Sequence, residues 1–206
     1  MKNRSILYYI KKLNKPIFTT SELSLVSGKT SSVVVQSLRF LEKEDIVMKV
    51  YRGIWVEKDR AISPYELIPY LFTTHRVYVS LISALHLYGI IEQIPQVITL
   101  VSTQHTKIIK TKLATFYVYR ITPKFFIGFD WYKEGGSFLI AEPEKALVDC
   151  LYLSSRKNKQ FRFFPELYFP KTFSFKKAFA WVKVIDNPKI AKYVEKKLKE
   201  VKQNYR

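Results

Sequence analysis

The sequence predicts an α+β protein in two parts, a small N-terminal domain over residues 1–61 and a larger domain over residues 62–206. The first part has apolar residues at helical spacing, while the second has several short runs rich in Val, Ile, Tyr and Phe. The pattern changes around Ser63-Pro64, which marks the boundary. With 206 residues, 48% of them hydrophobic, the chain can bury a sizeable core.

The charge balance is strongly basic, with 35 Lys and Arg against 17 Asp and Glu and a net charge of +18. This excess favours a polyanionic partner, either nucleic acid or an anionic membrane surface. The apolar runs are too short or too interrupted for a signal peptide or a bilayer span, so we expect no membrane protein. The single cysteine, Cys150, lies among apolar residues and indicates a cytoplasmic protein without disulfides.

The N-terminal domain begins with two predicted helices. Ile6, Leu7 and Ile10 fall at helical spacing, and this helix stops before Pro16. Thr20 or Ser21 can cap a second, short helix that ends before Gly28, where a left-handed residue is needed.

A third helix and a hairpin complete this domain. The helix spans Ser31–Lys43, with its apolar residues on one face and polar residues on the other. Two β-rich runs, Val47–Tyr51 and Ile54–Glu57, follow and meet at a tight turn containing Gly53. This order is typical of a winged helix-turn-helix. A three-helix domain that serves only dimerisation is the alternative.

A winged helix would place the Ser31–Lys43 helix in the major groove of double-stranded DNA. Polar side chains at the start of the helix would then face the base edges, basic ones would contact phosphates, and the hairpin turn would allow an arginine to reach the minor groove. The predicted base contacts are Thr30, Ser31, Ser32 and Gln36; the predicted phosphate contacts are Lys29, Arg39, Lys49 and Arg52; and the turn is Tyr51-Arg52-Gly53.

The larger domain is predicted to contain an antiparallel sheet with flanking helices. Ser80 can cap a helix that stops at Gly89. The expected strands cover 97–103, 112–121, 125–132 and 137–141, and their aromatic residues Phe116, Tyr117, Tyr119 and Trp131 are interpreted as core or sheet-face residues. Two basic helices are expected near 173–185 and 188–203. The second has a stripe that extends the DNA contact or is simply solvated: Lys192, Lys196, Lys199 and Lys202.

Residues 141–153, AEPEKALVDCLYL, concentrate charge in a way that invites a catalytic interpretation. Pro143 suits the first position of a helix, and Glu142 and Glu144 would lie near the positive end of its dipole. Lys145 and Asp149 have the i, i+4 spacing of a surface ion pair. The charges therefore predict a helix start.

We expect neither catalysis nor a cofactor. The three histidines have no metal-ligand spacing, and no second cysteine is present to complete a zinc site, so no metal is predicted either. The competing hypothesis is a metal-dependent nuclease built on Glu142, Glu144 and Lys145. It would need a further carboxylate from elsewhere in the chain.

Four stretches, SLISALHLYGII, QVITLVST, FYVYRITPKFFIGF and IAEPEKALVDCLYL, resemble the AbiEi family of antitoxins and transcriptional regulators of abortive-infection systems. The resemblance covers about residues 5 to 155, and the last stretch is its most specific part. It implies that the N-terminal domain binds and represses its own promoter, and that the larger domain counteracts a nucleotidyltransferase-type toxin encoded next door. It implies no enzymatic activity. A stand-alone regulator without a toxin partner is the alternative, and residues 156–206 match no pattern of the family.

Overall fold

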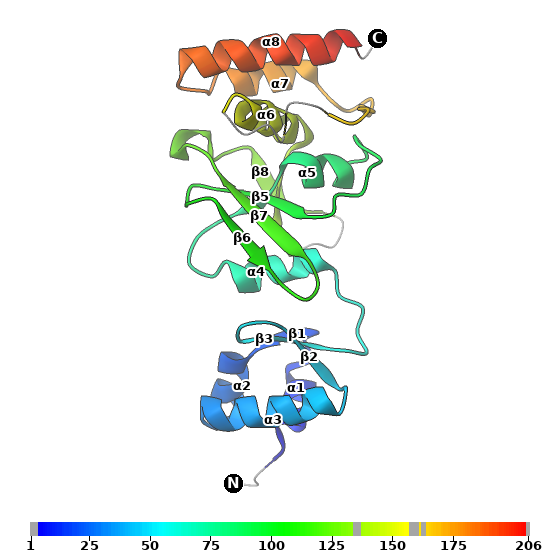
Figure 1. Cartoon of the computed structure of the whole chain (residues 1–206), viewed down its shortest axis with the longest axis vertical. Coiled ribbons are helices and arrows are strands. Elements are labelled where there is room, and N and C mark those ends of the chain that lie inside the picture. The colour runs from blue at the N-terminus through cyan, green and yellow to red at the C-terminus, as the bar shows by residue number, and fades with distance from the viewer. Residues whose placement is uncertain (1–3, 134–136, 157–160, 162–163, 205–206) are drawn as a thin grey trace. The chain divides into compact units, whose positions relative to one another are not determined.

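The computed structural model describes residues 4–133, 137–156, 161 and 164–204. Helices and two sheets, one of three strands and one of six, give an α+β fold, as predicted (Figure 1). Residue contacts divide the chain into two compact units. The first comprises Met1–Thr73 and Lys110–Ala114, and the second comprises Thr74–Ile109 and Thr115–Arg206.

The first unit combines helices with a small three-stranded sheet. Its elements are α1 (Ile6–Leu13), β1 (Ile17–Thr19), α2 (Thr20–Ser27), α3 (Ser31–Lys43), β2 (Val47–Tyr51), β3 (Ile54–Glu57), the 3₁₀ turn η1 (Pro64–Leu67) and α4 (Ile68–Leu71). The strand order is β1-β3-β2, and both pairings are antiparallel. The bounds of α3, β2 and β3 confirm those predicted, whereas β1 was not predicted.

The start of α2 differs from the prediction by one residue. Thr19 is the cap, not Thr20 or Ser21: its hydroxyl accepts the Glu22 backbone N–H at 3.0 Å, and the Glu22 carboxylate accepts the Thr19 N–H at 2.7 Å. This reciprocal pair satisfies two donors that the first helical turn leaves open. Gly28 ends the helix with a φ of 68°, as predicted.

The core of the first unit lies between helices α1, α2 and α3 and the sheet. Trp55 of β3 is 1% exposed, and its indole N–H donates to the Thr20 hydroxyl at 3.1 Å, which fastens the sheet to the start of α2. The other buried members of this core are Ile6, Ile10, Phe18, Leu23, Val34, Leu38, Leu41 and Val47. The predicted apolar face of α3 is thus confirmed as its buried face.

The second unit consists of a sheet and stacked helices. Its elements are β4 (Tyr78–Val79), α5 (Leu81–Leu87), β5 (Ile98–Ser102), β6 (Lys107–Lys110), β7 (Thr115–Arg120), the 3₁₀ turn η2 (Pro123–Phe125), β8 (Phe129–Trp131), β9 (Leu139–Ala141), α6 (Pro143–Ser154), α7 (Phe175–Val182) and α8 (Pro188–Asn204). The strand order is β6-β7-β5-β4-β9-β8.

The sheet is mixed, so the predicted antiparallel sheet is wrong. β5 and β7 run parallel, from Ile98 beside Phe116 to Ser102 beside Arg120, and β4 runs parallel to β9. The reason lies in two strands that the sequence did not reveal. β6 has only the sequence KIIK and lies at the edge of the sheet beside β7. Because β6 comes between β5 and β7 in the chain, β7 can pair with β5 in the parallel direction. β4 has two residues, too few for an alternating pattern.

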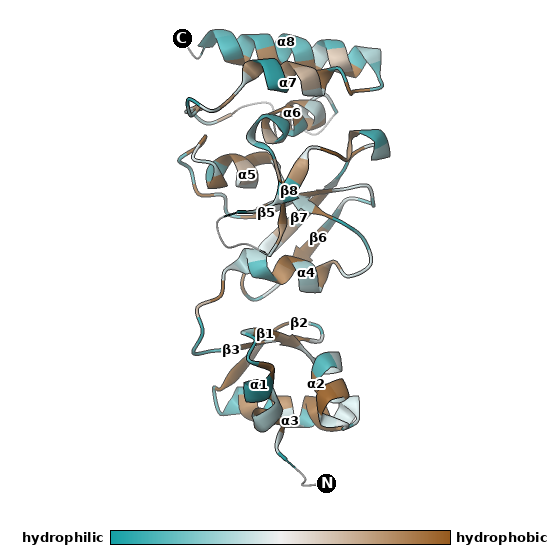
Figure 2. Ribbon diagram, turned by 180° about the vertical axis from the view of Figure 1, so that it is seen from behind, coloured by the Kyte–Doolittle hydropathy of each residue, from teal (hydrophilic) through white to brown (hydrophobic). Residues whose placement is uncertain are grey.

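Helix α6 is the middle layer of the second unit. Figure 1 shows α7 and α8 on the far side of α6 from the sheet, and α6 packs on α5, α7 and α8. It begins at Pro143 as predicted, but every residue from Glu144 to Ser154 is buried. A helix covered on all sides needs no polar face. By contrast, α8 is mostly hydrophilic (Figure 2) and buries only Val194 and Leu198.

The aromatic residues that were interpreted as core or sheet-face residues lie on strands of the sheet and differ in burial. Phe116 and Tyr119 are buried, as expected for core residues, but Trp131 of the edge strand β8 is 61% exposed. An edge strand has a neighbour on one side only, so its side chains are less covered.

None of the helices in the described part of the chain is long and apolar enough to cross a membrane.

Candidate functional site

The nine residues predicted to contact DNA lie on three neighbouring segments: the connection between α2 and α3, helix α3 itself, and the hairpin of β2 and β3. Helix α3 packs against both α2 and β2, so the three segments adjoin. Lys29 is half-buried, and the other eight side chains are exposed: Thr30, Ser31, Ser32, Gln36, Arg39, Lys49, Tyr51 and Arg52. The exposure of the four that lie on α3 follows from the helical period, since Val34, Leu38 and Leu41 occupy the buried face.

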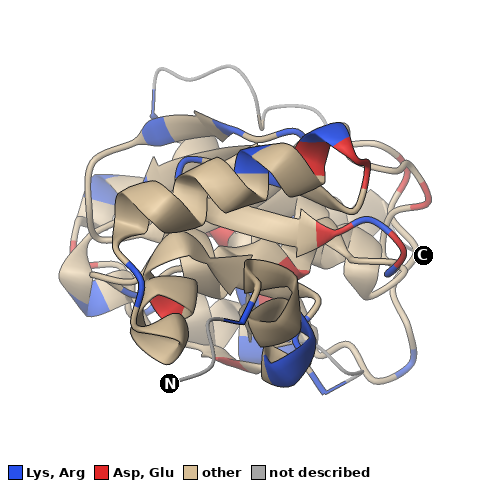
Figure 3. Cartoon of the chain, turned by 90° about the horizontal axis from the view of Figure 1, so that it is seen from below, with Lys and Arg blue, Asp and Glu red and all other residues tan. Residues whose placement is uncertain are grey.

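The start of α3 presents neutral polar groups. Thr30 precedes the helix without capping it through its side chain, and its hydroxyl lies 3.0 Å from that of Ser32. All charged residues of α3 fall within its last five positions, and Figure 3 shows its N-terminal half without charge. Hydroxyl and amide side chains can both donate and accept hydrogen bonds, which is what base edges require.

The hairpin is hydrogen-bonded to both α2 and α3. The Thr20 backbone N–H at the start of α2 donates to the Gly53 carbonyl at 2.9 Å, in the predicted tight turn, where Gly53 has a positive φ. In the middle of β2, the Lys49 N–H donates to the Glu42 carboxylate of α3 at 3.0 Å. The register shifts between Lys49 and Tyr51, which bends the strand there.

Apolar side chains are also exposed on α2 and α3, and the sequence analysis did not single them out. Leu25 is 85% exposed and Phe40 is 61% exposed, while Val26 and Val33 are each 42% exposed. The available signal was their position: Val33 and Phe40 are seven residues apart on α3 and lie off its buried face. Val33 and Phe40 share a face of α3, and neighbouring exposed apolar side chains are more typical of a contact surface than of a solvated face.

The charged residues of α6 lie inside the second unit. Lys145 and Asp149 form an ion pair in which both side chains are 0% exposed, so the predicted surface pair is wrong. The i, i+4 spacing is the same in both cases, and the difference comes from the elements that cover α6. The Asp149 carboxylate also accepts hydrogen bonds from the Tyr78 hydroxyl at 3.0 Å and the Ser80 hydroxyl at 2.8 Å.

Ser80 occupies the position before α5, as predicted, but its side chain does not cap that helix. Its hydroxyl donates to Asp149 instead, so Tyr78 and Ser80 join β4 and the start of α5 to α6. Local sequence patterns could not predict this role, because Tyr78 and Ser80 lie 71 and 69 residues from Asp149 along the chain.

The surroundings of Lys145 exclude water. Its ammonium nitrogen lies 3.8 Å from the centre of the Phe125 ring and 3.2 Å from the Tyr78 hydroxyl oxygen. Gly128 has a φ of 77°, and a Cβ there would lie 3.1 Å from Lys145 Cγ and 2.7 Å from the Trp181 ring. Burial lowers the pKa of Lys145, and burial raises the pKa of Asp149, each against the attraction of the partner's charge.

The two glutamates at the start of α6 are held by α7. The Glu144 carboxylate, which is 4% exposed, accepts the backbone N–H of Ser174 at 2.9 Å. Lys177 Nζ lies 3.1 Å from Glu142 Oε2 and 3.8 Å from Glu144 Oε2. Within the described residues, no three His, Cys, Asp or Glu side chains come together in a group that could hold a metal ion.

Comparisons with known proteins add no relative: no protein-family model matches the chain, and no curated protein matches it. The resemblance of the four stretches to the AbiEi family therefore stays a prediction. Two groups of residues are therefore the candidates for a functional role. One is the exposed polar face of α3 beside the hairpin, and the other is the buried ion pair of Lys145 and Asp149 in the second unit.

Replacing Lys145 by Met should reduce the free energy of unfolding by about 3–5 kcal/mol, because Asp149 would keep a buried charge without its partner. Urea unfolding measures this. The double variant Lys145→Met/Asp149→Leu is the control and should lose less than the single variant, since no buried charge remains. A loss below about 1 kcal/mol for Lys145→Met, as for an exposed pair, would contradict the burial of the pair.

The Glu42 carboxylate should make the stability of the first unit sensitive to acid. Accepting the Lys49 N–H lowers the pKa of Glu42 from its ordinary value of 4.5. Its stabilising effect is therefore complete above pH 4.5 and is lost as the pH falls through the lowered pKa. We expect wild type to lose more stability than Glu42→Gln below pH 4.5 in urea unfolding. Parallel pH profiles for the two proteins would contradict this.

Proposed function

We propose that the first unit is a winged helix-turn-helix that binds duplex DNA and represses transcription from its own promoter. The single observation that carries the proposal is the exposed polar face of α3 beside a hairpin anchored to it at Glu42. The element order, with a short helix before α3 and a hairpin after it, supports the same interpretation. The net charge of +18 supplies the general attraction to a polyanion.

In this proposal the N-terminal half of α3 lies in the major groove. Ser31, Ser32 and Gln36 would meet base edges, and the absence of charge there favours hydrogen bonding over nonspecific attraction. Arg39, farther along the helix, would contact a phosphate. Arg52 at the exposed hairpin turn would reach the adjacent minor groove, where a narrow groove attracts arginine.

The role proposed for the second unit is that of an antitoxin against a nucleotidyltransferase-type toxin encoded beside it. The IAEPEKALVDCLYL segment, through its resemblance to the AbiEi family, supports this role. A stand-alone regulator remains the alternative for a chain without such a neighbour. The nuclease alternative has little support, because its lysine, Lys145, is fully buried in an ion pair and out of reach of a substrate.

A dimerisation surface is a second candidate function for the first unit. The exposed Leu25, Val26, Val33 and Phe40 favour it, because burying such side chains against a second copy would remove apolar area from water. The two functions are compatible, since helix-turn-helix proteins commonly bind two half-sites as dimers.

Replacing Arg39 or Arg52 by Ala should weaken binding of the full chain to a labelled duplex of its own upstream region. Loss of the Arg39 phosphate contact should flatten the log–log salt dependence by about 0.9. Gln36→Ala should instead reduce discrimination between that duplex and one of unrelated sequence. Fluorescence anisotropy at several salt concentrations measures both effects.

Arg76→Ala is the matched control for these variants, because Arg76 is an exposed arginine of the second unit, outside the candidate surface. It should bind DNA as wild type does. Equal losses for Arg39, Arg52 and Arg76 would mean that charge alone, not this surface, binds DNA. No binding to the upstream duplex at low salt would overturn the proposal.

The two proposed activities should separate in cells. The Arg39→Ala/Arg52→Ala variant, which leaves the second unit unchanged, should lose repression of a promoter reporter but still protect cells from the neighbouring toxin. Reporter output and colony survival on toxin induction measure the two activities. Loss of protection by this variant at normal protein levels would contradict the division of roles, and survival unaffected by wild type would contradict the antitoxin role.

A further inference from the structure

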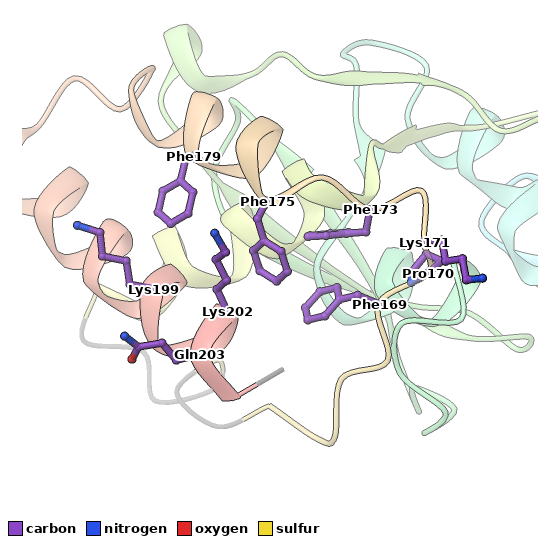
Figure 4. A pocket seen from close by; sticks show the side chains of 9 residues that line it. All are labelled: Phe169, Pro170, Lys171, Phe173, Phe175, Phe179, Lys199, Lys202 and Gln203. Carbon is purple, nitrogen blue, oxygen red and sulfur yellow. The ribbon is translucent and has the colours of Figure 1, made fainter. Parts of the chain in front are cut away.

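A hollow of about 720 Å³ lies beside α7 and α8 in the second unit. Figure 4 shows the side chains that line it. Phe175 and Phe179 come from α7, Phe169 and Phe173 from the segment before it, and Lys199 and Lys202 from α8. Its volume falls within the range of small-molecule sites.

One wall of the hollow is aromatic. The rings of Phe169 and Phe173 have their centres 4.4 Å apart, and the Phe175 ring lies 5.1 Å from each of them. Phe169 is buried at the base of this cluster, while Phe173, Phe175 and Phe179 are half-buried. The rings of Phe169, Phe173 and Phe175 contact one another, and together with Phe179 they form an apolar wall against which a flat group can pack.

The polar side chains around the hollow are cationic or neutral. Lys171, Lys199 and Lys202 contribute charge, Gln203 contributes an amide, and no Asp or Glu is among the lining residues. Lys199 Nζ forms an ion pair with Glu195 Oε1 of the same helix at 2.7 Å. Lys202, three residues farther along α8, forms no ion pair with any residue in the described ranges, and Figure 4 shows its ammonium group directed to the side where Phe175 and Phe179 lie.

We propose that this pocket binds a nucleotide, with its base against the phenylalanine rings and its phosphate at Lys199 and Lys202. An aromatic wall beside cations suits a ligand that is flat at one end and anionic at the other. The amide of Gln203 has both a donor and an acceptor for a base edge. A base paired and stacked within a duplex cannot reach such a wall, so the site is distinct from the DNA-binding surface proposed for the first unit.

This ligand chemistry has two sources, a free nucleotide and an unpaired nucleotide of a single strand. The full-length protein is therefore titrated in three separate calorimetric experiments, in the absence of divalent cations. The ligands are ATP, tripolyphosphate and a ten-residue oligothymidylate. ATP should bind about tenfold more tightly than tripolyphosphate, because only ATP carries a base that can stack. Oligothymidylate that binds and is displaced by ATP would identify the strand as the source, and ATP binding alone would identify the free nucleotide.

Two variants locate the site. Phe179→Leu keeps an apolar side chain but removes the flat ring, and it should weaken ATP about tenfold while leaving tripolyphosphate unchanged. Lys202→Ala should weaken both ligands. Lys192→Ala is the matched control, because Lys192 is an exposed lysine of the same helix that does not line the pocket. It should bind both ligands as wild type does.

Four results would overturn the proposal, and the first two need no variant. One is the absence of ATP binding at millimolar concentration, and another is equal affinity for ATP and tripolyphosphate, which would mean that phosphate alone is bound. A third is an equal loss in Lys192→Ala and Lys202→Ala, which would mean diffuse attraction to α8. Binding of an acidic, phenylalanine-containing peptide in place of ATP would assign the pocket to a protein partner and would likewise overturn it.

Discussion

The arrangement of the second unit depends on the buried ion pair of Lys145 and Asp149. A buried charge is tolerated only where its partner and its hydrogen bonds are in place, so the pair fixes the position of every group that satisfies it. Tyr78 on β4 and Ser80 at the start of α5 donate hydrogen bonds to Asp149. The ring of Phe125, in the turn that precedes β8, lies against the Lys145 ammonium group. The pair therefore specifies how α6 sits on the sheet.

The burial of these charges changes the meaning of the most distinctive sequence segment. A charged stretch in a basic protein is easily interpreted as a surface, yet here Glu144, Lys145 and Asp149 all face the interior or the neighbouring helix α7. The segment holds three carboxylates and one lysine, so the positive excess of the chain lies entirely outside it. The basic residues outside it include exposed side chains at the end of α3, on the hairpin and along α8. The segment therefore belongs to the core of the second unit and not to its charged exterior.

Local signals predicted the first unit well. The apolar period of α3, the glycine after α2 and the turn at Gly53 each involve residues close in the sequence, and the exposure of Gln36 and Arg39 follows from the helical period alone. Features that depend on distant residues were not predictable in this way. The direction of β7 relative to β5, the cover over Lys145 and the phenylalanine pocket all arise from segments that meet only in the folded chain.

The two units differ in how far along the chain their partners lie, which has a consequence for folding during synthesis. The first unit draws nearly all its contacts from its first 73 residues, so it can form soon after that segment leaves the ribosome. β4, by contrast, sits at the centre of its sheet and pairs in parallel with β9, with Val79 beside Ile140. Such distant pairing slows folding. Until β9 and α6 have been synthesised, β4 lacks one of its two neighbouring strands, and the Tyr78 hydroxyl lacks the Asp149 carboxylate to which it donates.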